Sequence, residues 1–253
     1  EYLAYKIYNE LTDISYRVQL VEVTYQDSET GKRKKQWAFL IEDTAQLRDR
    51  LSADKCNGCL NQNMEAFEQK TFKLMSVFLY MIGNSDWSAL AGRNTKLIKT
   101  KDQILAIPYD FDFSGMVDAP YATANTNYHL TSRKDRVYLG FEEHLENVTS
   151  TFQYILSKKV EIFKMIKKFK LLNTSDKRAI IKYLETFFDA TTFQVLGRNY
   201  HLQYDGVVRF DVKMKVELRQ VLEEYIPNFI EYNGVWKVPL KKEERVRFVI
   251  DIL

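Results

Sequence analysis

Hydrophobic residues recur with two different periods in the first part of the chain. In residues 1–12 they return at helical spacing, which predicts a helix. Residues 16–25 and 36–43 are rich in Val, Leu, Ile and aromatic side chains, and a polar segment separates them, so we expect a hairpin of two strands. The basic run at 32–35 falls in this polar segment and is typical of a solvated hairpin tip rather than of a phosphate-binding patch.

The middle of the chain combines long helical patterns with short apolar runs. Residues 64–82 predict one long helix, and the apolar runs at 95–99 and 103–115 predict two strands that a turn connects. Two further helical runs follow at 141–172 and 176–196. Helices and hairpins that follow one another in this way predict an α+β fold.

The C-terminal part of the chain has a different pattern. Apolar and polar residues alternate over 208–218 and again over 246–252, which predicts strands, and a predicted helix between them leads to Pro227. This part contains no candidate chemistry. The chain therefore divides into a small α+β unit, a helical unit and a strand-rich appendage, at 1–55, 56–200 and 203–253.

Composition and charge exclude several classes of protein. Hydrophobic residues make up 45% of the chain and charged residues 28%, which excludes a disordered tail and a collagen-like fibre. No apolar run approaches the roughly 18 residues that a transmembrane helix needs, so we expect no membrane span. Lys and Arg number 37 against 34 Asp and Glu, and a net charge of +3 gives no reason to expect a nucleic-acid partner.

The two cysteines, Cys56 and Cys59, are too few for a disulfide framework. A structural zinc site would need two further ligands, and the three histidines show no matching spacing. We expect two free thiols in a loop, with a disulfide or redox pair as the alternative.

Four oxygen-bearing side chains lie at the ends of the predicted elements. Asp86 follows the long helix, Asn94 precedes the first short strand, and Asp110 and Asp112 end the second. Mg²⁺ takes oxygen ligands, commonly one or two carboxylates together with phosphate oxygens. A further aspartate beside the metal orients a hydroxyl group or accepts its proton in phosphoryl transfer. Each residue taken alone is equally compatible with a turn cap, but the four in this order favour a Mg²⁺-nucleotide site.

These residues also carry a family resemblance. The sequence GNSD at 83–86 with Asn94, followed by PYDFD at 108–112, resembles the catalytic loop and metal-binding segment of atypical protein-kinase-like enzymes. It is most similar to the spore-coat CotH kinase family and more distantly to the HipA-type kinases. The order of the predicted elements over residues 1–200 is similar as well.

The resemblance implies a protein-kinase-like two-lobed fold with a partial N-lobe, a helical C-lobe and a strand-containing C-terminal appendage. It implies phosphoryl transfer that depends on ATP and on Mg²⁺ or Mn²⁺, with a protein Ser/Thr or a small-molecule hydroxyl as acceptor. Asp86 matches the catalytic aspartate. The implied metal ligands are Asn94, Asp110 and Asp112, and the implied nucleotide-site residues are Glu1 on the first helix and the acidic hinge, Glu42 and Asp43.

The chain also departs from the family pattern. Asn94 lies eight residues after Asp86, a longer interval than in ordinary kinases, and Ser88 replaces the His of HipA-type loops. The chain starts with Glu1 in what reads as the middle of a helix, so we expect part of a longer protein. The glycine-rich loop and its lysine are expected upstream of Glu1. No signal peptide is visible, and both a cytoplasmic and an extracytoplasmic location stay open.

Two other functions are compatible with the same residues. One is a catalytically inactive kinase fold, a pseudokinase that acts as a binding module. The other is a haloacid-dehalogenase-type phosphatase, in which Asp110 would be the nucleophile and Asp112 the acid/base. That fold normally begins its sheet with the strand before this motif and supplies an acidic metal motif later, whereas 109 residues precede Asp110 and no Asp-Asp follows it.

Overall fold

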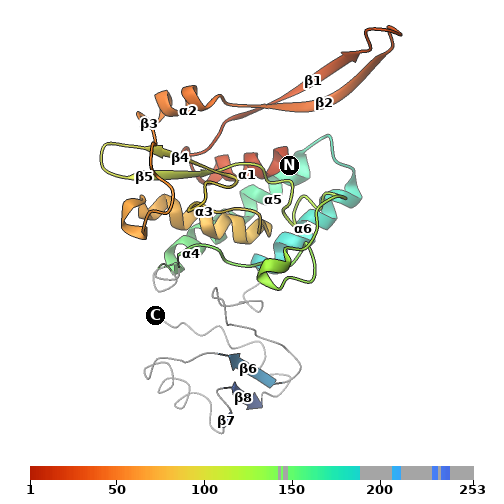
Figure 1. Cartoon of the computed structure of the whole chain (residues 1–253). Coiled ribbons are helices and arrows are strands. Elements are labelled where there is room, and N and C mark those ends of the chain that lie inside the picture. Colours follow the sequence, from red (N-terminus) through yellow and green to blue (C-terminus); the bar gives the residue numbers. More distant parts are fainter. Residues whose placement is uncertain (142–143, 145–147, 189–206, 212–229, 233–234, 240–253) are drawn as a thin grey trace. The chain divides into compact units, whose positions relative to one another are not determined.

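The computed structural model describes residues 1–141, 144, 148–188, 207–211, 230–232 and 235–239 (Figure 1). These residues belong to two compact units, which divide between Leu184 and Glu185. The described elements are helices and small antiparallel sheets, so the predicted α+β class is confirmed.

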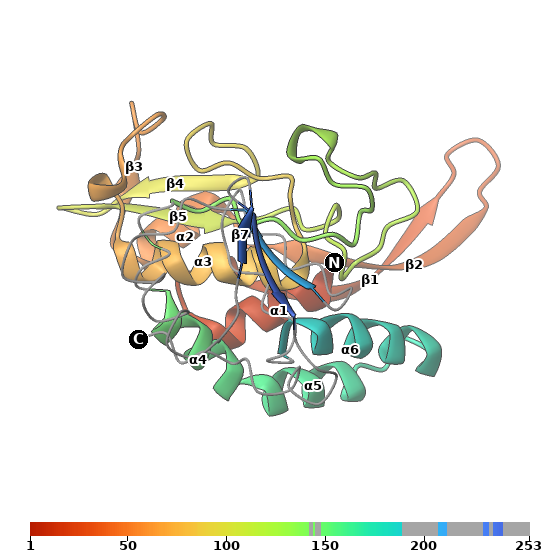
Figure 2. The same ribbon diagram turned by 90° about the horizontal axis from the view of Figure 1, so that it is seen from below.

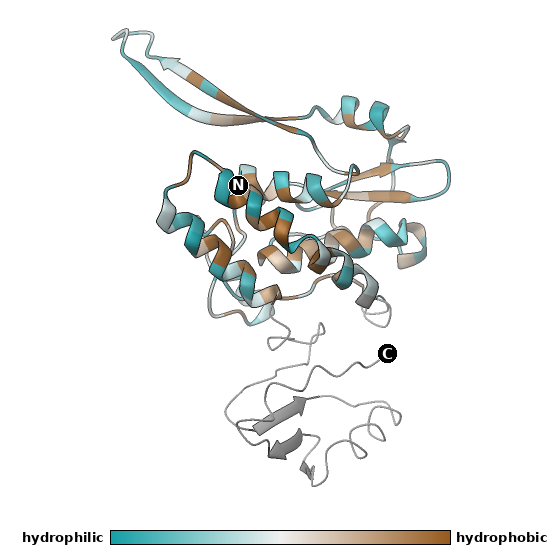
Figure 3. Cartoon of the chain, turned by 180° about the vertical axis from the view of Figure 1, so that it is seen from behind, coloured by the Kyte–Doolittle hydropathy of each residue, from teal (hydrophilic) through white to brown (hydrophobic). Residues whose placement is uncertain are grey.

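The first unit begins with a helix and a long hairpin. Helix α1 (Tyr2–Leu11) buries the apolar face that its spacing predicts. Strands β1 (Val18–Gln26) and β2 (Arg33–Ile41) pair antiparallel along their whole length, and the far end of the hairpin is hydrophilic (Figure 3). The basic run at 32–35 is solvent-exposed as predicted, but most of it lies in β2 because the strands continue beyond the apolar residues.

A short helix and a short strand lead to the central helix of this unit. Helix α2 (Thr44–Arg50), which the sequence pattern did not predict, is followed by β3 (Asp54–Lys55) and the 3₁₀ turn η1 (Met64–Ala66). The predicted helix at 64–82 begins later, as α3 (Gln69–Ile82), because the Glu68 carboxylate caps it by accepting from backbone N–H groups of its first turn. Almost every side chain of α3 after its first turn is buried.

Strands β4 (Thr95–Lys99) and β5 (Ile104–Pro108) pair antiparallel, and β3 joins them on the other side of β4. The predicted strand at 103–115 was therefore too long. It ends at Pro108 because Asp110 has a φ of 61°, a left-handed conformation that does not continue a strand. The two aspartates consequently lie in a turn and not on a strand.

Three further helices follow. They are α4 (Thr149–Ser157), α5 (Lys159–Lys168) and α6 (Thr174–Phe188), with the 3₁₀ turn η2 (Thr126–Tyr128) in the preceding loop. Helix α4 packs against α3, and α5 packs against α1. Figures 1 and 2 agree that α3 lies between the sheet and α4. The single helix predicted at 141–172 is thus divided, and the predicted helix at 176–196 is described only as far as Phe188.

A chain of aromatic rings joins α1 and α3 to the turn after β5. The ring centroids of Tyr8 and Phe78 are 4.6 Å apart, those of Phe78 and Phe111 5.6 Å, and those of Phe111 and Tyr5 4.5 Å. All four side chains are buried. Such contacts add to the burial of apolar area and hold Phe111, which lies between the two aspartates, against both helices.

Cys56 and Cys59 form a disulfide, so the expectation of two free thiols was wrong and its alternative is found. Gly58, with a φ of 74°, allows the tight turn that brings the two Cα atoms to 5.6 Å. The N–H of Asn61 donates to the carbonyl of Leu90, so the disulfide loop contacts the loop that leads to Asn94.

The second unit contains a three-stranded antiparallel sheet. Its strands are β6 (Val207–Asp211), β7 (Ile230–Tyr232) and β8 (Val235–Pro239), with β8 in the middle. Strand β6 begins the alternating pattern predicted over 208–218. The rest of that pattern, the helix before Pro227 and the strand at 246–252 lie outside the described residues. None of the helices that the structure describes has the length and apolar character needed to cross a membrane.

Candidate functional site

The turn after α3 holds Asp86 in place through Asn84. Helix α3 ends at Gly83, whose left-handed φ of 67° is typical of a helix C-terminus. The Oδ1 of Asn84, which is buried, accepts from the Asp86 N–H at 2.9 Å, and its Nδ2 is 3.4 Å from the carbonyl oxygen of Asp110. One buried carboxamide therefore connects the two predicted halves of the site.

Asn94 lies directly beside Asp86. Its Nδ2 donates to the Asp86 carbonyl at 2.7 Å and to the Asp86 Oδ2 at 3.1 Å. Because the amide nitrogen points toward Asp86, the Oδ1 of Asn94 is left without a hydrogen-bond partner among the described residues. Asn94 also has a left-handed φ of 48°, a conformation that asparagine adopts more readily than most residues. An oxygen held in this way is suited to a cation.

Two side chains of α1 bind the turn that contains Asp110. The Asp110 N–H donates to the Oη of Tyr5 at 2.8 Å, and the Phe111 N–H donates to the Oε1 of Glu1 at 3.3 Å. The sequence prediction placed Glu1 at a nucleotide site. In this structure its carboxylate contacts the backbone next to the predicted metal ligand, and Tyr5, one helical turn later, makes the companion contact.

The carboxyl of Asp110 has an unusual electrostatic environment. Partial burial raises its pKa to about 6, and a hydrogen bond with Asp112 and the negative charges of Asp112, Glu1 and Asp86 act in the same direction. The Oδ2 of Asp112 also accepts a hydrogen bond from Tyr121 at 3.0 Å. A divalent cation at Asp110 would relieve this repulsion, which is the electrostatic property expected of a metal site.

Asp86 also has a cationic neighbour that the sequence analysis did not identify. The Nε of Arg93 lies 3.4 Å from the Asp86 Oδ1. The position of Arg93 follows from an antiparallel bridge between Ser88 and Arg93, whose two backbone hydrogen bonds are each 2.9 Å long. No sequence signal indicated this, because the bridge depends on the path of the loop.

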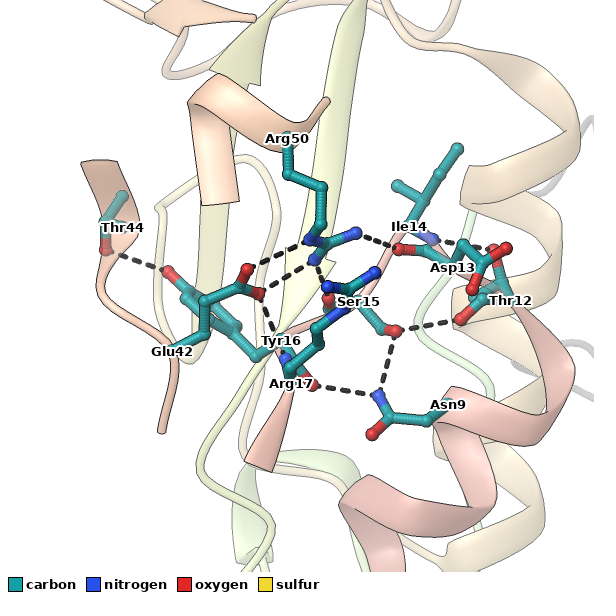
Figure 4. A network of polar contacts seen from close by, with 10 residues as sticks. All are labelled: Asn9, Thr12, Asp13, Ile14, Ser15, Tyr16, Arg17, Glu42, Thr44 and Arg50. Atoms are coloured by element: carbon teal, nitrogen blue, oxygen red, sulfur yellow. Dashed lines mark hydrogen bonds and ion pairs between the residues drawn. The ribbon is translucent and has the colours of Figure 1, made fainter. Parts of the chain in front are cut away.

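The two other predicted nucleotide-site residues, Glu42 and Asp43, both make hydrogen bonds within the first unit, and Figure 4 shows those of Glu42. Both carboxylate oxygens of Glu42 accept from Arg50, at 2.8 and 2.9 Å, and one also accepts from the backbone N–H of Arg17. The Asp43 carboxylate caps α2 by accepting from the Ala45 N–H at 2.7 Å. Sequence alone gave no partner for either residue.

A cavity of about 800 Å³ lies next to this network rather than at Asp86. Residues from α1, β1 and the end of β2 line it, among them Lys6, Asn9, Glu42 and Asp43. Its lining does not include Asp86, Asn94, Asp110 or Asp112. Asp86, in contrast, is half-buried and Asp110 is exposed, in the turns that follow α3 and β5.

Two glycines fix the backbone behind the Asp86 turn. The Gly115 N–H donates to the Gly83 carbonyl at 3.0 Å, and the phenol of Tyr183 on α6 packs against both residues. A Cβ built on Gly83 or on Gly115 would overlap the Tyr183 Oη. A side chain at either position would therefore require the Tyr183 phenol to move, and at Gly83 it would also have to adopt the left-handed conformation. The sequence placed Gly83 in a turn but did not predict its contact with α6.

The residues present would hold a cation only together with further oxygen ligands. Among the residues that the structure describes, no three His, Cys, Asp or Glu side chains are grouped so as to bind a metal ion by themselves. Asn94 and Asp110 would each supply one oxygen, which fits a Mg²⁺ ion that takes its other ligands from phosphate and water.

Comparison of the chain with protein-family models, with curated proteins and with solved structures found no match.

Proposed function

We propose that this protein transfers a phosphoryl group from ATP to a hydroxyl acceptor with Mg²⁺ or Mn²⁺, as an atypical kinase similar to the CotH-like and HipA-like families. The observation that carries the proposal is the Asp86, Asn94 and Asp110 group. Asn84 binds the backbone of both Asp86 and Asp110, and Asn94 binds the backbone and the carboxylate of Asp86, so these hydrogen bonds hold the three residues around the β4–β5 hairpin.

Each residue has a role that its contacts support. Asp86, which is only half-buried and has an ionised neighbour, would orient the acceptor hydroxyl and accept its proton. Asn94 and Asp110 would hold the metal ion, with Asp112 beside them. When bound, the ion would neutralise charge on the β- and γ-phosphates.

The contacts of α1 connect it to the proposed metal site. In this proposal, α1 and the β1–β2 hairpin belong to a partial N-lobe, and α3 to α6 form the helical C-lobe. Tyr5 and Glu1 bind the backbone of the Asp110 turn, so a movement of α1 would move the metal ligand with it. Phe111, packed against Tyr5, strengthens this connection.

The acceptor is proposed as a protein Ser/Thr or a small molecule with a hydroxyl group. The alternative is a pseudokinase, which would bind nucleotide and show no turnover. Asp86 and Asn94 would be arranged in the same way in both, so a measurement of turnover distinguishes an active kinase from a pseudokinase.

Two substitutions test the proposal on the complete protein. Asp86→Ala should lower turnover by about 10²–10⁴-fold, the range for loss of a general acid–base group, and should change ATP affinity far less. Asp110→Ala should lower both turnover and Mg²⁺-dependent ATP affinity because it removes a metal ligand. The measurements are phosphate release or transfer and calorimetric ATP binding.

Asp102→Ala is the matched control, since Asp102 is an exposed aspartate in the turn between β4 and β5. It should behave as wild type in both measurements. Equal activity of wild type and Asp86→Ala contradicts the catalytic role. A wild type that binds Mg-ATP without any turnover favours the pseudokinase.

A further inference from the structure

Arg93 occupies a position that a structural ion pair does not explain. Its side chain is 48% exposed and that of Asp86 is 34% exposed. An ion pair in contact with water contributes little to stability. The loop nevertheless fixes Arg93 beside Asp86 by two backbone hydrogen bonds to Ser88, and Gly92 provides the left-handed turn, with a φ of 64°, that the bridge requires.

The guanidinium keeps most of its donors available. Its Nε faces the Asp86 Oδ1, and no hydrogen bond from either Nη atom is found within the described part of the chain. A guanidinium carries five N–H donors in a planar fork that matches two phosphate oxygens. Arg93 thus has free donors at the place where, under the proposed function, the acceptor hydroxyl meets the phosphoryl group.

The charges around the site show why such a donor is needed. The negative charges of Asp112, Glu1 and Asp86 all act on Asp110, so the surroundings of this carboxyl are negative. A γ-phosphoryl group brings further negative charge. Among the described residues, Arg93 is the one cation within ion-pair distance of Asp86, Asp110 or Asp112.

We propose that Arg93 is a catalytic residue that contacts the γ-phosphoryl group during transfer. The inference rests on the proposed function. In the step, the acceptor hydroxyl oxygen forms a bond to the γ-phosphorus while the bond from phosphorus to the bridging oxygen breaks and its electron pair leaves with ADP. The hydroxyl proton goes to the Asp86 carboxylate. Arg93 donates to the equatorial phosphoryl oxygens, which carry the charge in the transition state.

The test compares Arg93→Gln and Arg93→Lys with a matched control, Lys96→Gln. Lys96 is an exposed cation three residues away on β4, so its substitution removes the same charge from the surface. Arg93→Gln should lower kcat for Mg-ATP hydrolysis by about 10²–10³-fold, as for loss of one preorganised transition-state donor. Arg93→Lys should retain part of kcat, and Lys96→Gln should match wild type.

A binding measurement distinguishes a catalytic role of Arg93 from a purely structural one, because a structural role would not weaken binding of a transition-state mimic selectively. The affinity for Mg-ADP with aluminium fluoride, a mimic of the transferring phosphoryl group, should fall with kcat in Arg93→Gln, while the affinity for Mg-ATP changes much less. If Arg93→Gln has the same kcat and the same affinity for Mg-ADP with aluminium fluoride as wild type, this inference is overturned. The proposed function is not affected by that result. A wild type that does not bind Mg-ATP overturns the proposed function and this inference with it.

Discussion

Asp110 combines two features that are unfavourable for folding. Its left-handed backbone conformation is costly for most residues, and its pKa is raised to about 6 by partial burial and by the neighbouring carboxylates. A carboxyl group with a raised pKa destabilises the folded protein when it is ionised. Unfavourable features of this kind are common at functional sites, where binding of a ligand offsets them.

We therefore expect Asp110→Asn to raise the melting temperature at pH 7.5. Asparagine tolerates the left-handed conformation, and the substitution removes the negative charge of the Asp110 carboxylate. The wild-type carboxyl takes up its proton at about pH 6 when folded and near 3.8 when unfolded, so wild-type stability increases as the pH falls through this window. The difference between variant and wild type should shrink below pH 4.

Thermal unfolding between pH 4 and pH 8 measures this difference, with Asp102→Asn as the control. Asp102 is exposed in a turn, and its substitution should leave the melting temperature unchanged at every pH. An Asp110→Asn variant that is less stable than wild type at pH 7.5 would show that the carboxylate is stabilising where it lies.

The sequence predicted that Asp86, Asn94 and Asp110 lie close together, but it did not predict the contacts that hold them. Asp86, Asn94 and Asp110 are brought together because they sit at the ends of consecutive elements, a relation that is visible along the chain. The contact of Tyr5 with Asp110 joins residues far apart in sequence, and no periodic pattern indicates such a pair. Glu42 and Asp43 were assigned only from the family resemblance, which did not indicate the hydrogen bonds that their carboxylates make in the first unit.

Arg50 connects three elements of the first unit. From α2, its guanidinium binds the Glu42 carboxylate at the end of β2 and the carbonyls of Asp13 and Ser15 in the loop after α1. The two charged side chains are only 17% and 9% exposed. The hydrogen bonds with Arg50 hold the pKa of Glu42 below its usual value.

Replacing Arg50 with Leu should lower the free energy of unfolding by about 3 kcal/mol at pH 7, because the Glu42 charge is left unpaired in a mostly buried position. Since the Glu42 pKa is lowered in the folded state, the stabilisation from its ionised form is present above pH 4.5 and is lost as the pH falls through the folded pKa. The cost of Arg50→Leu should decrease over the same range.

Urea denaturation at several pH values measures this cost, and Lys35→Leu provides the comparison. Lys35 forms an ion pair with Glu22 on the exposed hairpin, which should contribute less than about 1 kcal/mol. A cost of Arg50→Leu as small as that of Lys35→Leu would contradict the structural role of the Arg50 contacts.

The periodic recurrence of apolar residues predicted where helices and strands lie. It did not predict the residues at which they begin and end. Helix α2 was not predicted because it is short and buries only one residue, so its sequence shows no periodic apolar pattern. Strand β2 extends into the basic run because cross-strand pairing continues without an apolar face. Strand β5 ends early because of the backbone conformation at Asp110, which its composition does not show.

The first unit as a whole arranges the site around its central helix. Helix α3 ends at the Asp86 turn, the neighbouring β5 ends at the Asp110 turn, and α1 binds that turn from the other side. The α+β class followed from the sequence pattern. The two-lobed kinase architecture remains part of the proposal, and it requires that nucleotide binding depend on a metal held by Asn94 and Asp110.

Calorimetric binding of a non-hydrolysable ATP analogue to the complete protein, with and without Mg²⁺, tests this requirement most directly. Wild type should bind the analogue in the presence of Mg²⁺ and much more weakly after chelation, because the phosphates would otherwise face the carboxylates of Asp86 and Asp110 alone. Asp110→Asn should lose most of this metal dependence, whereas Asp102→Asn should keep it. Binding that needs no metal and is equal in wild type and Asp110→Asn would contradict the account.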